Sequence, residues 1–154
     1  MQKCEETERK LTNAGLDLAD FASGHEYFGL HFREGAWVLR EWAPHASSVH
    51  LKGSFSDWRA KPEYALTRGA DGVWEIRLPA DALGHGDEYR LEVGWPGGNG
   101  DRFPAFVRRV VQDPNTQSFN AQVWRPEVPY QWSHTAPRRP EGPLLLYETH
   151  VGMA

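Results

Sequence analysis

Hydrophobic and polar residues alternate through the middle of the chain in short runs that are separated by turn residues. Within residues 73–78, Trp74, Ile76 and Leu78 share one parity, and the residues between them share the other. This alternation is typical of a strand with one buried face, so it places Trp74 in a core. Similar runs occupy residues 26–33, 36–42, 49–53, 87–94 and 106–112. Several short strands at this spacing predict an all-β sandwich.

The flanks of this strand region have other patterns. The first 22 residues are polar with scattered apolar positions, which predicts one or two short helices interrupted near Gly15. Residues 114–143 hold six of the eleven prolines. Because proline lacks the amide hydrogen that a helix interior or a central strand needs, we expect an extended linker here, held on the surface by Trp124, Tyr130 and Trp132. The expected divisions are an N-terminal helical segment (residues 1–23), a β-sandwich (24–113) and a linker (114–143).

Residues 144–154 form a last segment of different character. Leu144, Leu145, Leu146 and Tyr147 make a continuous apolar run, which is typical of a strand buried on both faces of a parallel sheet. Since nothing follows to cover such a strand, we expect the chain to be a fragment and this segment to begin a domain that is missing. Without neighbouring strands, the run is expected to be disordered, to pack back on the sandwich or to pair with another copy.

The composition narrows the classes of partner and cofactor. The net charge is −4, with 17 Lys and Arg against 21 Asp and Glu and no basic block, so a nucleic acid is not an expected partner. No apolar run approaches the ~18 residues of a membrane span, and the charged N-terminus does not resemble a signal peptide. The single cysteine, Cys4, fits a reducing compartment, so we expect a cytoplasmic protein. The seven histidines lack the spacing of Cys/His ligands, so neither a metal site nor a cofactor is expected.

Tryptophan is the one compositional outlier, with seven residues in the chain. Trp58 closes the segment Gly53-Ser54-Phe55-Ser56-Asp57-Trp58, a strand end that runs into a turn of small and polar residues. At this loop tip it is either a lid on the sandwich edge or a flat plate for a sugar ring, which has apolar C–H faces and hydroxyl edges. Strand parity also places Arg40, Trp42 and Arg90 on solvent-facing positions. Two plates and one arginine would bind weakly, near the ~1 mM that corresponds to about −4 kcal/mol.

Five motifs occur in an order that resembles a known family. They are Tyr27-Phe28-Gly29, Arg40-Glu41-Trp42-Ala43-Pro44, Gly53-Ser54-Phe55-Ser56-Asp57-Trp58, Gly72-Val73-Trp74-Glu75 and Tyr147-Glu148-Thr149-His150-Val151-Gly152-Met153. Together they resemble the N-terminal part of glycogen/starch branching enzymes (1,4-α-glucan branching enzymes of glycoside hydrolase family 13), from about Gly24 to the end. The resemblance implies that the sandwich is an immunoglobulin-like carbohydrate-binding module of family 48. It also implies that the last segment is the first strand of a catalytic (β/α)8 barrel.

The resemblance implies a set of glucan-contacting residues as well. They are Trp42, Ala43 and Pro44; Trp58; Asp71, Gly72 and Val73; and Arg90, with Trp95 as either a second plate or a structural residue. Two positions depart from the family pattern. Ser56 stands where many relatives have Asn, so a hydrogen bond there is expected to differ. Val73 stands where relatives are often polar or basic, so only a backbone contact is expected from it.

The resemblance implies α-glucan binding by a module that is not catalytic by itself. Its partners would be α-1,4-glucans (glycogen, amylose, maltooligosaccharides) and the barrel of the same parent chain, which transfers α-1,4 chains to form α-1,6 branches. Retaining glycosidic chemistry needs two carboxyl groups about 5–5.5 Å apart. In the family these lie on later barrel strands, so Glu148 and His150 are expected to be structural. Two alternatives stay open: a module of a debranching or related α-glucan hydrolase, and a structural or interaction sandwich without sugar binding.

Overall fold

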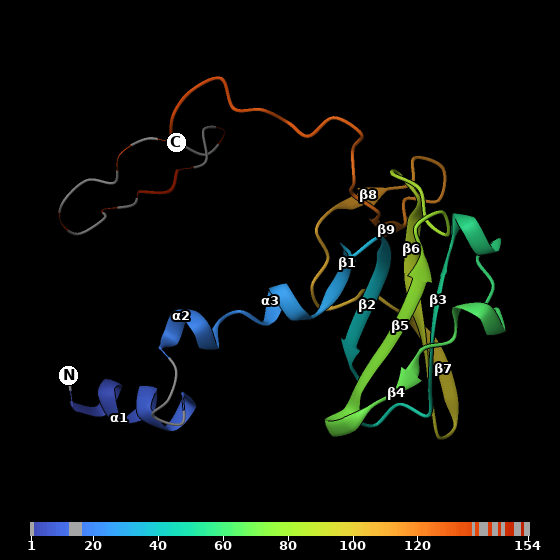
Figure 1. The fold of residues 1–154 in the computed structure, drawn as a ribbon, viewed down its shortest axis with the longest axis horizontal. Helices are drawn as coiled ribbons and strands as arrows, with labels where there is room; N and C mark the ends of the chain where they lie inside the picture. The colour runs from blue at the N-terminus through green and yellow to red at the C-terminus, as the bar shows by residue number, and fades with distance from the viewer. Residues whose placement is uncertain are drawn as a thin grey trace.

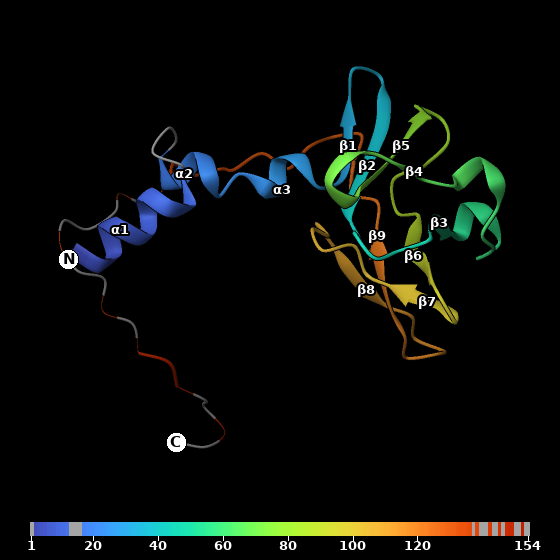
Figure 2. The ribbon, with the colours of Figure 1, turned by 90° about the horizontal axis from the view of Figure 1, so that it is seen from below.

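The computed structural model describes residues 2–12, 17–136, 138, 142, 145, 147–149 and 152. Two antiparallel sheets pack face to face, and Figure 2 shows them as separate layers. Sheet A contains, in spatial order, β1 (Gly29–Arg33), β2 (Ala36–Trp42), β5 (Val73–Pro79) and β4 (Thr67–Arg68). Sheet B contains, in spatial order, β3 (Ser48–Gly53), β6 (Glu88–Trp95), β9 (Phe119–Gln122) and β8 (Val110–Gln112), with β7 (Gly98–Arg102) paired to β6. This arrangement confirms the predicted β-sandwich (Figure 1).

Alternating strand positions fill the space between the sheets. Trp37 and Leu39 of β2 and Trp74 of β5 share one core cluster with Leu51 of β3 and Leu91 of β6. None of the five is more than 5% exposed, as the parity of residues 73–78 predicted for Trp74. Full burial of such a side chain contributes roughly 1.5–3 kcal/mol, so this cluster is the main source of stability that holds the two sheets together.

Within the described residues, three short helices precede the sandwich. The first two, α1 (Gln2–Leu11) and α2 (Leu18–Phe21), lie where the sequence predicted them. The third, α3 (Gly24–Tyr27), was not expected, because it occupies the start of a run that was predicted to be a strand. Gly29 allows the chain to turn from α3 into β1, since its φ of +87° is a conformation that side chains with a Cβ rarely adopt.

The C-terminal boundary of the sandwich differs from the prediction. The presumed linker begins at residue 114, yet β9 lies inside it and forms an interior strand of sheet B between β6 and β8. The prolines do not prevent this, because Pro114 lies in the β8–β9 turn and the next proline is Pro126, which leaves Phe119–Gln122 free to pair. Ala121 and Val123 are at most 1% exposed. The sandwich therefore extends to Val123.

Beyond Val123, one of the three predicted anchors contacts the sandwich. Trp124 packs edge-on against His85, and the Arg109 guanidinium lies 4.2 Å from its ring centroid. Tyr130 and Trp132 instead pack against each other and remain 73% and 83% exposed, so the prediction that they hold the linker down was wrong.

The predicted barrel strand falls largely outside the described residues. Leu144, Leu146, His150 and Val151 are not described, and neither are Met153 and Ala154. Leu145 and Tyr147, which are described, have no strand assignment and are about nine-tenths exposed, at 91% and 90%. The assignment of residues 144–154 to a barrel stays a prediction.

A buried histidine gives the fold a pH dependence. His31 of β1 is 6% exposed; its Nε2 lies 2.8 Å from the Phe28 carbonyl oxygen, and Arg108 donates to its Nδ1 over 3.1 Å. This pattern requires a neutral ring that donates from Nε2 and accepts at Nδ1. Burial lowers the pKa of His31, the Phe28 carbonyl partly opposes that shift, and the nearby Arg108, Arg33 and Arg40 lower the pKa further.

Because the folded pKa of His31 lies below its unfolded value near 6.5, the unfolded chain takes up the proton first as the pH falls. This contribution to the free energy of unfolding is therefore complete above about pH 6.5 and is lost as the pH falls toward the folded pKa. We expect the urea midpoint to drop between pH 7 and 5.5, and to drop less in His31→Gln. Equal slopes in the two proteins over that range would contradict this assignment.

Candidate functional site

The structure divides the predicted site residues between the two ends of the sandwich. Trp42 lies at the end of β2, and the loop that follows it leads into β3. Trp58 follows the far end of β3, beyond the short helix η1 (Ser54–Ser56). At ~3.4 Å per residue, the length of β3 separates these two positions by about 17 Å or more. Figure 1 shows the arrowhead of β2 at the lower end of the sandwich and the helical turns after β3 on its right side.

We call the first group the Trp42 cluster. It comprises Trp42, Ala43, Pro44, Asp71, Gly72 and Val73, where β2 leaves sheet A and β5 enters it after the short helix η3 (Ala70–Gly72). The Trp42 indole Nε1 donates to the Asp71 carbonyl over 2.9 Å, and the Ala43 amide donates to the Gly72 carbonyl over 2.9 Å. These bonds fix one edge of the Trp42 ring, while the side chain remains 60% exposed.

The backbone under the Trp42 cluster is tightly held. Gly72 has a φ of +78°, and a Cβ there would lie 2.6 Å from the Cα of Pro44. Trp74 donates from Nε1 to the Ala43 carbonyl over 2.9 Å, and Arg68 donates to the Pro44 carbonyl over 2.8 Å. The Val73 carbonyl accepts the Gly69 amide over 2.7 Å, so the backbone contact expected from Val73 competes with a bond inside the fold.

A buried carboxylate beside this cluster was not anticipated. Glu41 is 8% exposed and lies on the core side of β2, where strand parity predicts an apolar residue. It accepts the Ala105 amide over 2.9 Å and the Trp42 amide over 3.2 Å. Burial raises the pKa of Glu41, and these two amides oppose that shift. Glu41 therefore ties the end of β2 to the segment around Ala105.

The second group is a shallow pocket of about 230 Å³, which we call the Trp58 pocket. Its lining residues come from the η1 turn, β6, the β8–β9 turn and β9, and they are Trp58, Arg90, Asp113, Thr116, Ser118 and Asn120. Sites for drug-sized ligands usually measure about 300–1,000 Å³. A hollow of this size with an aromatic wall and a polar floor is suited to one or two sugar rings of a longer chain.

Trp58 is held in a strained conformation. Asp57 and Trp58 have φ values of +55° and +56°, and the Trp58 amide donates to the Gly53 carbonyl over 3.0 Å. For a residue with a Cβ this left-handed conformation costs roughly 1–2 kcal/mol. The Trp58 side chain nevertheless stays 39% exposed. Strain that presents a large aromatic ring to solvent is typical of a functional position.

Ser56 fixes this turn from inside. It is fully buried, accepts the Gly53 amide over 3.0 Å and donates to the Gly53 carbonyl over 3.2 Å. The departure from the family pattern at this position therefore concerns the shape of the turn that presents Trp58 rather than a direct bond to a ligand.

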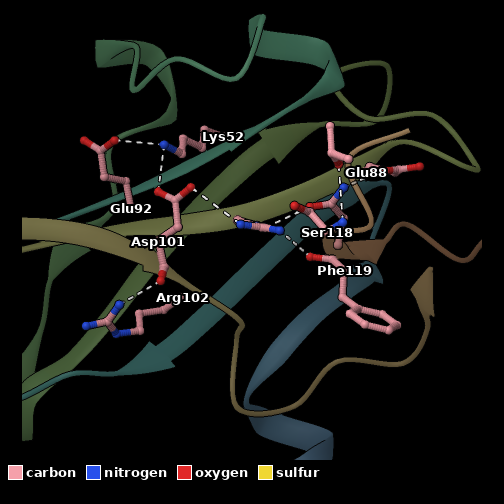
Figure 3. A network of polar contacts seen from close by, with 10 residues as sticks. Lys52, Glu88, Glu92, Asp101, Arg102, Ser118 and Phe119 are labelled. Carbon is pink, nitrogen blue, oxygen red and sulfur yellow. Dashed lines mark hydrogen bonds and ion pairs between the residues drawn. The ribbon is translucent and has the colours of Figure 1, made fainter. Parts of the chain in front are cut away.

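Arg90 organises the floor of the Trp58 pocket. Its Nε donates to the Asn120 Oδ1 over 2.8 Å, and its Nη2 donates to the Phe119 carbonyl over 2.5 Å. Asn120 in turn donates to the Glu88 carboxylate over 2.6 Å. Asp101 lies 3.9 Å from the Arg90 Nη1. Figure 3 shows Glu88, Asp101 and Phe119 among the residues of this network. Much of the hydrogen-bonding capacity of Arg90 is thus used to position β9.

The network continues away from the pocket. Asp101 also lies 2.8 Å from the Lys52 Nζ, and Lys52 donates to Glu92 over 3.0 Å (Figure 3). The Lys52 side chain is 12% exposed; burial opposes its charge, while hydrogen bonds to Asp101 and Glu92 raise its pKa. The outer face of sheet B is therefore held by paired charges behind the pocket floor.

The sequence does not indicate four of the pocket residues. Asp113 is the last residue of the expected sandwich, and Thr116, Ser118 and Asn120 lie in the expected linker. The only sequence signal was Asp113-Pro114-Asn115, which is a strong turn signature between two short apolar runs.

Trp95 lies outside both groups and packs on its own hairpin. Gly98 and Gly100 of β7 lie against its ring, with a Cβ on Gly98 coming within 3.5 Å of it, and Arg102 lies 5.3 Å from the ring centroid. The side chain is 37% exposed. These contacts give Trp95 a structural role in the β6–β7 hairpin, and contact with sugar stays a prediction.

Within the described residues, no cluster of three or more His, Cys, Asp or Glu side chains is arranged to bind a metal ion. The described helices also include none that is long and apolar enough to cross a membrane.

Comparison with known proteins identifies relatives of this chain. Residues 27–116 match the family model for carbohydrate-binding module 48 (isoamylase N-terminal domain). A 1,4-alpha-glucan-branching enzyme of Rhizophagus irregularis is 36% identical over 141 residues, which cover 87% of this chain and 20% of that enzyme. A 1,4-alpha-glucan-branching enzyme of Emericella nidulans is 38% identical over 149 residues, which cover 91% of this chain and 21% of that enzyme. The chain thus spans about one fifth of the length of these relatives.

Solved structures agree on the fold. The pullulanase type I of Bacillus subtilis str. 168, complexed with maltose, superposes with a TM-score of 0.55 at 22% identity over 77% of this chain and 16% of that chain. The catalytic module of the glycogen-degrading pneumococcal virulence factor SpuA gives a TM-score of 0.51 at 16% identity, over 64% of this chain and 16% of that chain. At these identities the likeness supports a shared fold alone.

Proposed function

The chain belongs to the carbohydrate-binding module 48 family, and from this premise we propose that it binds α-1,4-glucan through the Trp58 pocket, with the Trp42 cluster as a second contact. The observation that carries this proposal is the strained, exposed ring of Trp58 beside a polar hollow. The ring offers an apolar surface to one face of a glucosyl unit, and the hollow offers polar groups to its hydroxyl edge.

The expected affinity of one site is weak. Covering a large apolar group contributes roughly 1.5–3 kcal/mol, and association costs at least several kcal/mol. A single plate with a few hydrogen bonds therefore gives a Kd in the range of about 1 mM, equivalent to about −4 kcal/mol. Weak sites suit a polymer, because one chain offers many equivalent sites and a second contact raises the apparent affinity.

We further propose that the chain is the N-terminal module of a 1,4-α-glucan branching enzyme. Relatives with that name at 36% and 38% identity support this proposal, since their match extends over about nine-tenths of the chain. The partners would be glycogen, amylose or maltooligosaccharides, and the catalytic barrel of the same parent. The parent would supply the two carboxyl groups that retaining transfer needs. A cytoplasmic location is part of this proposal and rests on the single cysteine, Cys4.

The second candidate is a module of a debranching enzyme, and the pullulanase folds are the observation in its favour. Their identity to this chain is 22% or less in the two structures described, against 36% and 38% for the branching enzymes. The residues that follow position 154 in the parent would separate the two candidates. A sandwich that only acts as a spacer would bind no glucan.

Titration followed by tryptophan fluorescence tests the proposed binding. We expect a saturable change with maltoheptaose at millimolar concentration and with glycogen, and no saturable change with the β-linked glucan cellohexaose. Absence of any saturable change with both α-glucans would leave the spacer function as the remaining account.

The separation of the two groups predicts different responses to short and long glucans. A short oligosaccharide bound at Trp58 is too short to contact the Trp42 cluster about 17 Å away. A polymer can contact both groups at once. Trp42→Ala should therefore change the Kd for maltotriose less than twofold and weaken glycogen binding about 3- to 10-fold, as measured by fluorescence and by affinity electrophoresis. Equal losses for both ligands would contradict a two-contact mode.

A further inference from the structure

The Trp58 pocket contains a carboxylate with spare hydrogen-bonding capacity. Asp113, at the start of the β8–β9 turn, accepts the Asn115 and Thr116 amides on its Oδ1 over 2.8 Å and 3.0 Å. Its own amide donates to the Ser118 carbonyl over 2.8 Å. In the described part of the chain, its Oδ2 accepts no backbone amide and forms no ion pair. The backbone amides of Thr116 and Asn115 lower the pKa of Asp113, burial partly opposes that shift, and a hydrogen bond from the Thr116 hydroxyl adds to it, so the group is ionised at neutral pH.

The other polar groups of the pocket differ in how many hydrogen-bond donors and acceptors remain free for a ligand. Asn120 uses its oxygen on Arg90 and its nitrogen on Glu88, and it is only 5% exposed. Arg90 is directed at Asn120 and the Phe119 carbonyl. Ser118 and Thr116 are exposed residues that also line the pocket. The Thr116 hydroxyl already accepts the Ser118 amide over 3.3 Å and hydrogen-bonds to the Asp113 side chain. Hydrogen bonds to a ligand would therefore come mainly from the Asp113 carboxylate and the Ser118 hydroxyl.

The charge around the pocket is negative. Asp113 lines it and Glu88 lies beside its floor, where it accepts from Asn120. Arg90 is the one cation that lines it, and Asp101 is paired with Lys52 and Arg90. No lysine or arginine in the described residues forms an ion pair with Asp113. A ligand group that enters next to Asp113 must therefore donate a hydrogen, and an anionic group there meets repulsion that a neutral hydroxyl does not.

We propose that Asp113 is a specificity residue of the Trp58 pocket, whose carboxylate accepts a hydrogen bond from a hydroxyl of a neutral glucosyl unit and rejects a unit that carries a phosphate ester at that hydroxyl. This inference rests on the proposed glucan binding and deepens it. A hydroxyl bond to an ionised acceptor is roughly twice as strong as a bond between neutral groups. A phosphate ester at the same oxygen removes the donor and adds negative charge next to the carboxylate.

The test compares neutral maltoheptaose with phosphate-esterified maltooligosaccharides of matched length. Asp113→Asn keeps an oxygen for the Asn115 and Thr116 amides and removes the charge. We expect it to weaken maltoheptaose binding about tenfold. It should also reduce the preference for the neutral over the esterified glucan by at least as much. Asp81→Asn, which removes an exposed carboxylate outside the pocket, is the matched control and should leave both constants unchanged.

An Asp113→Asn variant with wild-type affinity and wild-type preference would overturn this inference. If that variant does not fold, Asp113→Ser, which keeps one oxygen for the turn, takes its place, and the urea midpoint of each variant is measured beside its Kd. Failure of the wild type to bind any α-glucan would instead remove the proposed function together with this inference. Binding that is lost in Trp58→Ala but retained in Asp113→Asn would leave the proposed function standing and exclude this role of Asp113 alone.

Discussion

Trp58→Gly and Trp58→Ala should both lose α-glucan binding, and the glycine variant should be the more stable of the two. Either change removes the plate, whose burial by a sugar is worth roughly 1.5–3 kcal/mol, so the Kd for maltoheptaose should rise about 10- to 150-fold. The φ of +56° at this position is open to glycine and strained for alanine. The free energy of unfolding should therefore be higher in Trp58→Gly by about 1 kcal/mol.

Alanine is usually more stabilising than glycine, so the reverse order at this position would indicate the strained left-handed backbone conformation of Trp58. The measurements are urea unfolding for stability and fluorescence or calorimetric titration for binding. Trp132→Ala is the matched control, because that tryptophan is 83% exposed and lies outside both groups. If both Trp58 variants bind maltoheptaose like the wild type, Trp58 is a lid on the sandwich edge and the pocket is not the glucan site.

Gly72→Ala should destabilise the sandwich by about 2–5 kcal/mol. Alanine at a φ of +78° costs roughly 1–2 kcal/mol. The new Cβ would also lie 2.6 Å from the Cα of Pro44, and overpacking of this kind typically costs 1–3 kcal/mol. Relief of that contact displaces Pro44 or the carbonyl of Asp71 that accepts the Trp42 indole. Glycogen binding should therefore weaken as it does in Trp42→Ala.

Gly86→Ala separates the two causes of the lost stability in Gly72→Ala, which are backbone strain and the clash with Pro44. Gly86 has a φ of +93°, and nothing lies within 4 Å of a Cβ placed on it, so its alanine variant carries backbone strain without a clash. We expect it to lose only about 1–2 kcal/mol in urea unfolding and to bind glycogen normally. Equal destabilisation in the two variants would show that the contact with Pro44 has no energetic role.

Alternation of apolar and polar residues correctly predicted the strands that have one buried face and one solvent-exposed face. In β5 and β6 the alternation of apolar and charged residues is regular, and Trp74, Tyr89 and Leu91 are buried as it predicts. Solvent exposure of Trp42 followed from the same rule. The rule failed at Glu41, because a distant backbone amide, that of Ala105, replaces the water that a buried carboxylate loses.

Only the first strand of the β8–β9 hairpin could be predicted from local sequence. β8 (Val110–Gln112) lies inside the apolar run of residues 106–112 that predicted a strand. β9 (Phe119–Gln122) has four residues, too few for a periodic signal, and the prolines of residues 114–143 indicate a linker there. What makes β9 an interior strand is its pairing with β6, about thirty residues earlier in the chain, where Tyr89 lies opposite Ala121. Non-local pairing of this kind leaves no mark in a single sequence.

Only part of the candidate site could be predicted from the sequence, because the rest of it depends on the same non-local pairing. The loop motif indicated Trp58, the family resemblance implied Arg90 and parity placed Arg90 in solvent, and the structure brings the two residues together. Asp113, Thr116, Ser118 and Asn120 could not be named without β9 in place. The structure also separates Trp58 from the Trp42 cluster, because β3 runs the length of the sandwich between them. A resemblance can list residues, but it does not say which of them share a surface.

The most direct test follows individual nuclear magnetic resonance signals of a ¹⁵N-labelled chain during titration with maltoheptaose. We expect saturable shifts of the Trp58 indole and of the backbone amides of residues 113 and 115–120, while the buried Trp37 indole stays in place. Saturable binding that leaves the Trp58 indole and these amides unshifted, or no shift at millimolar glucan, would contradict glucan binding in the Trp58 pocket.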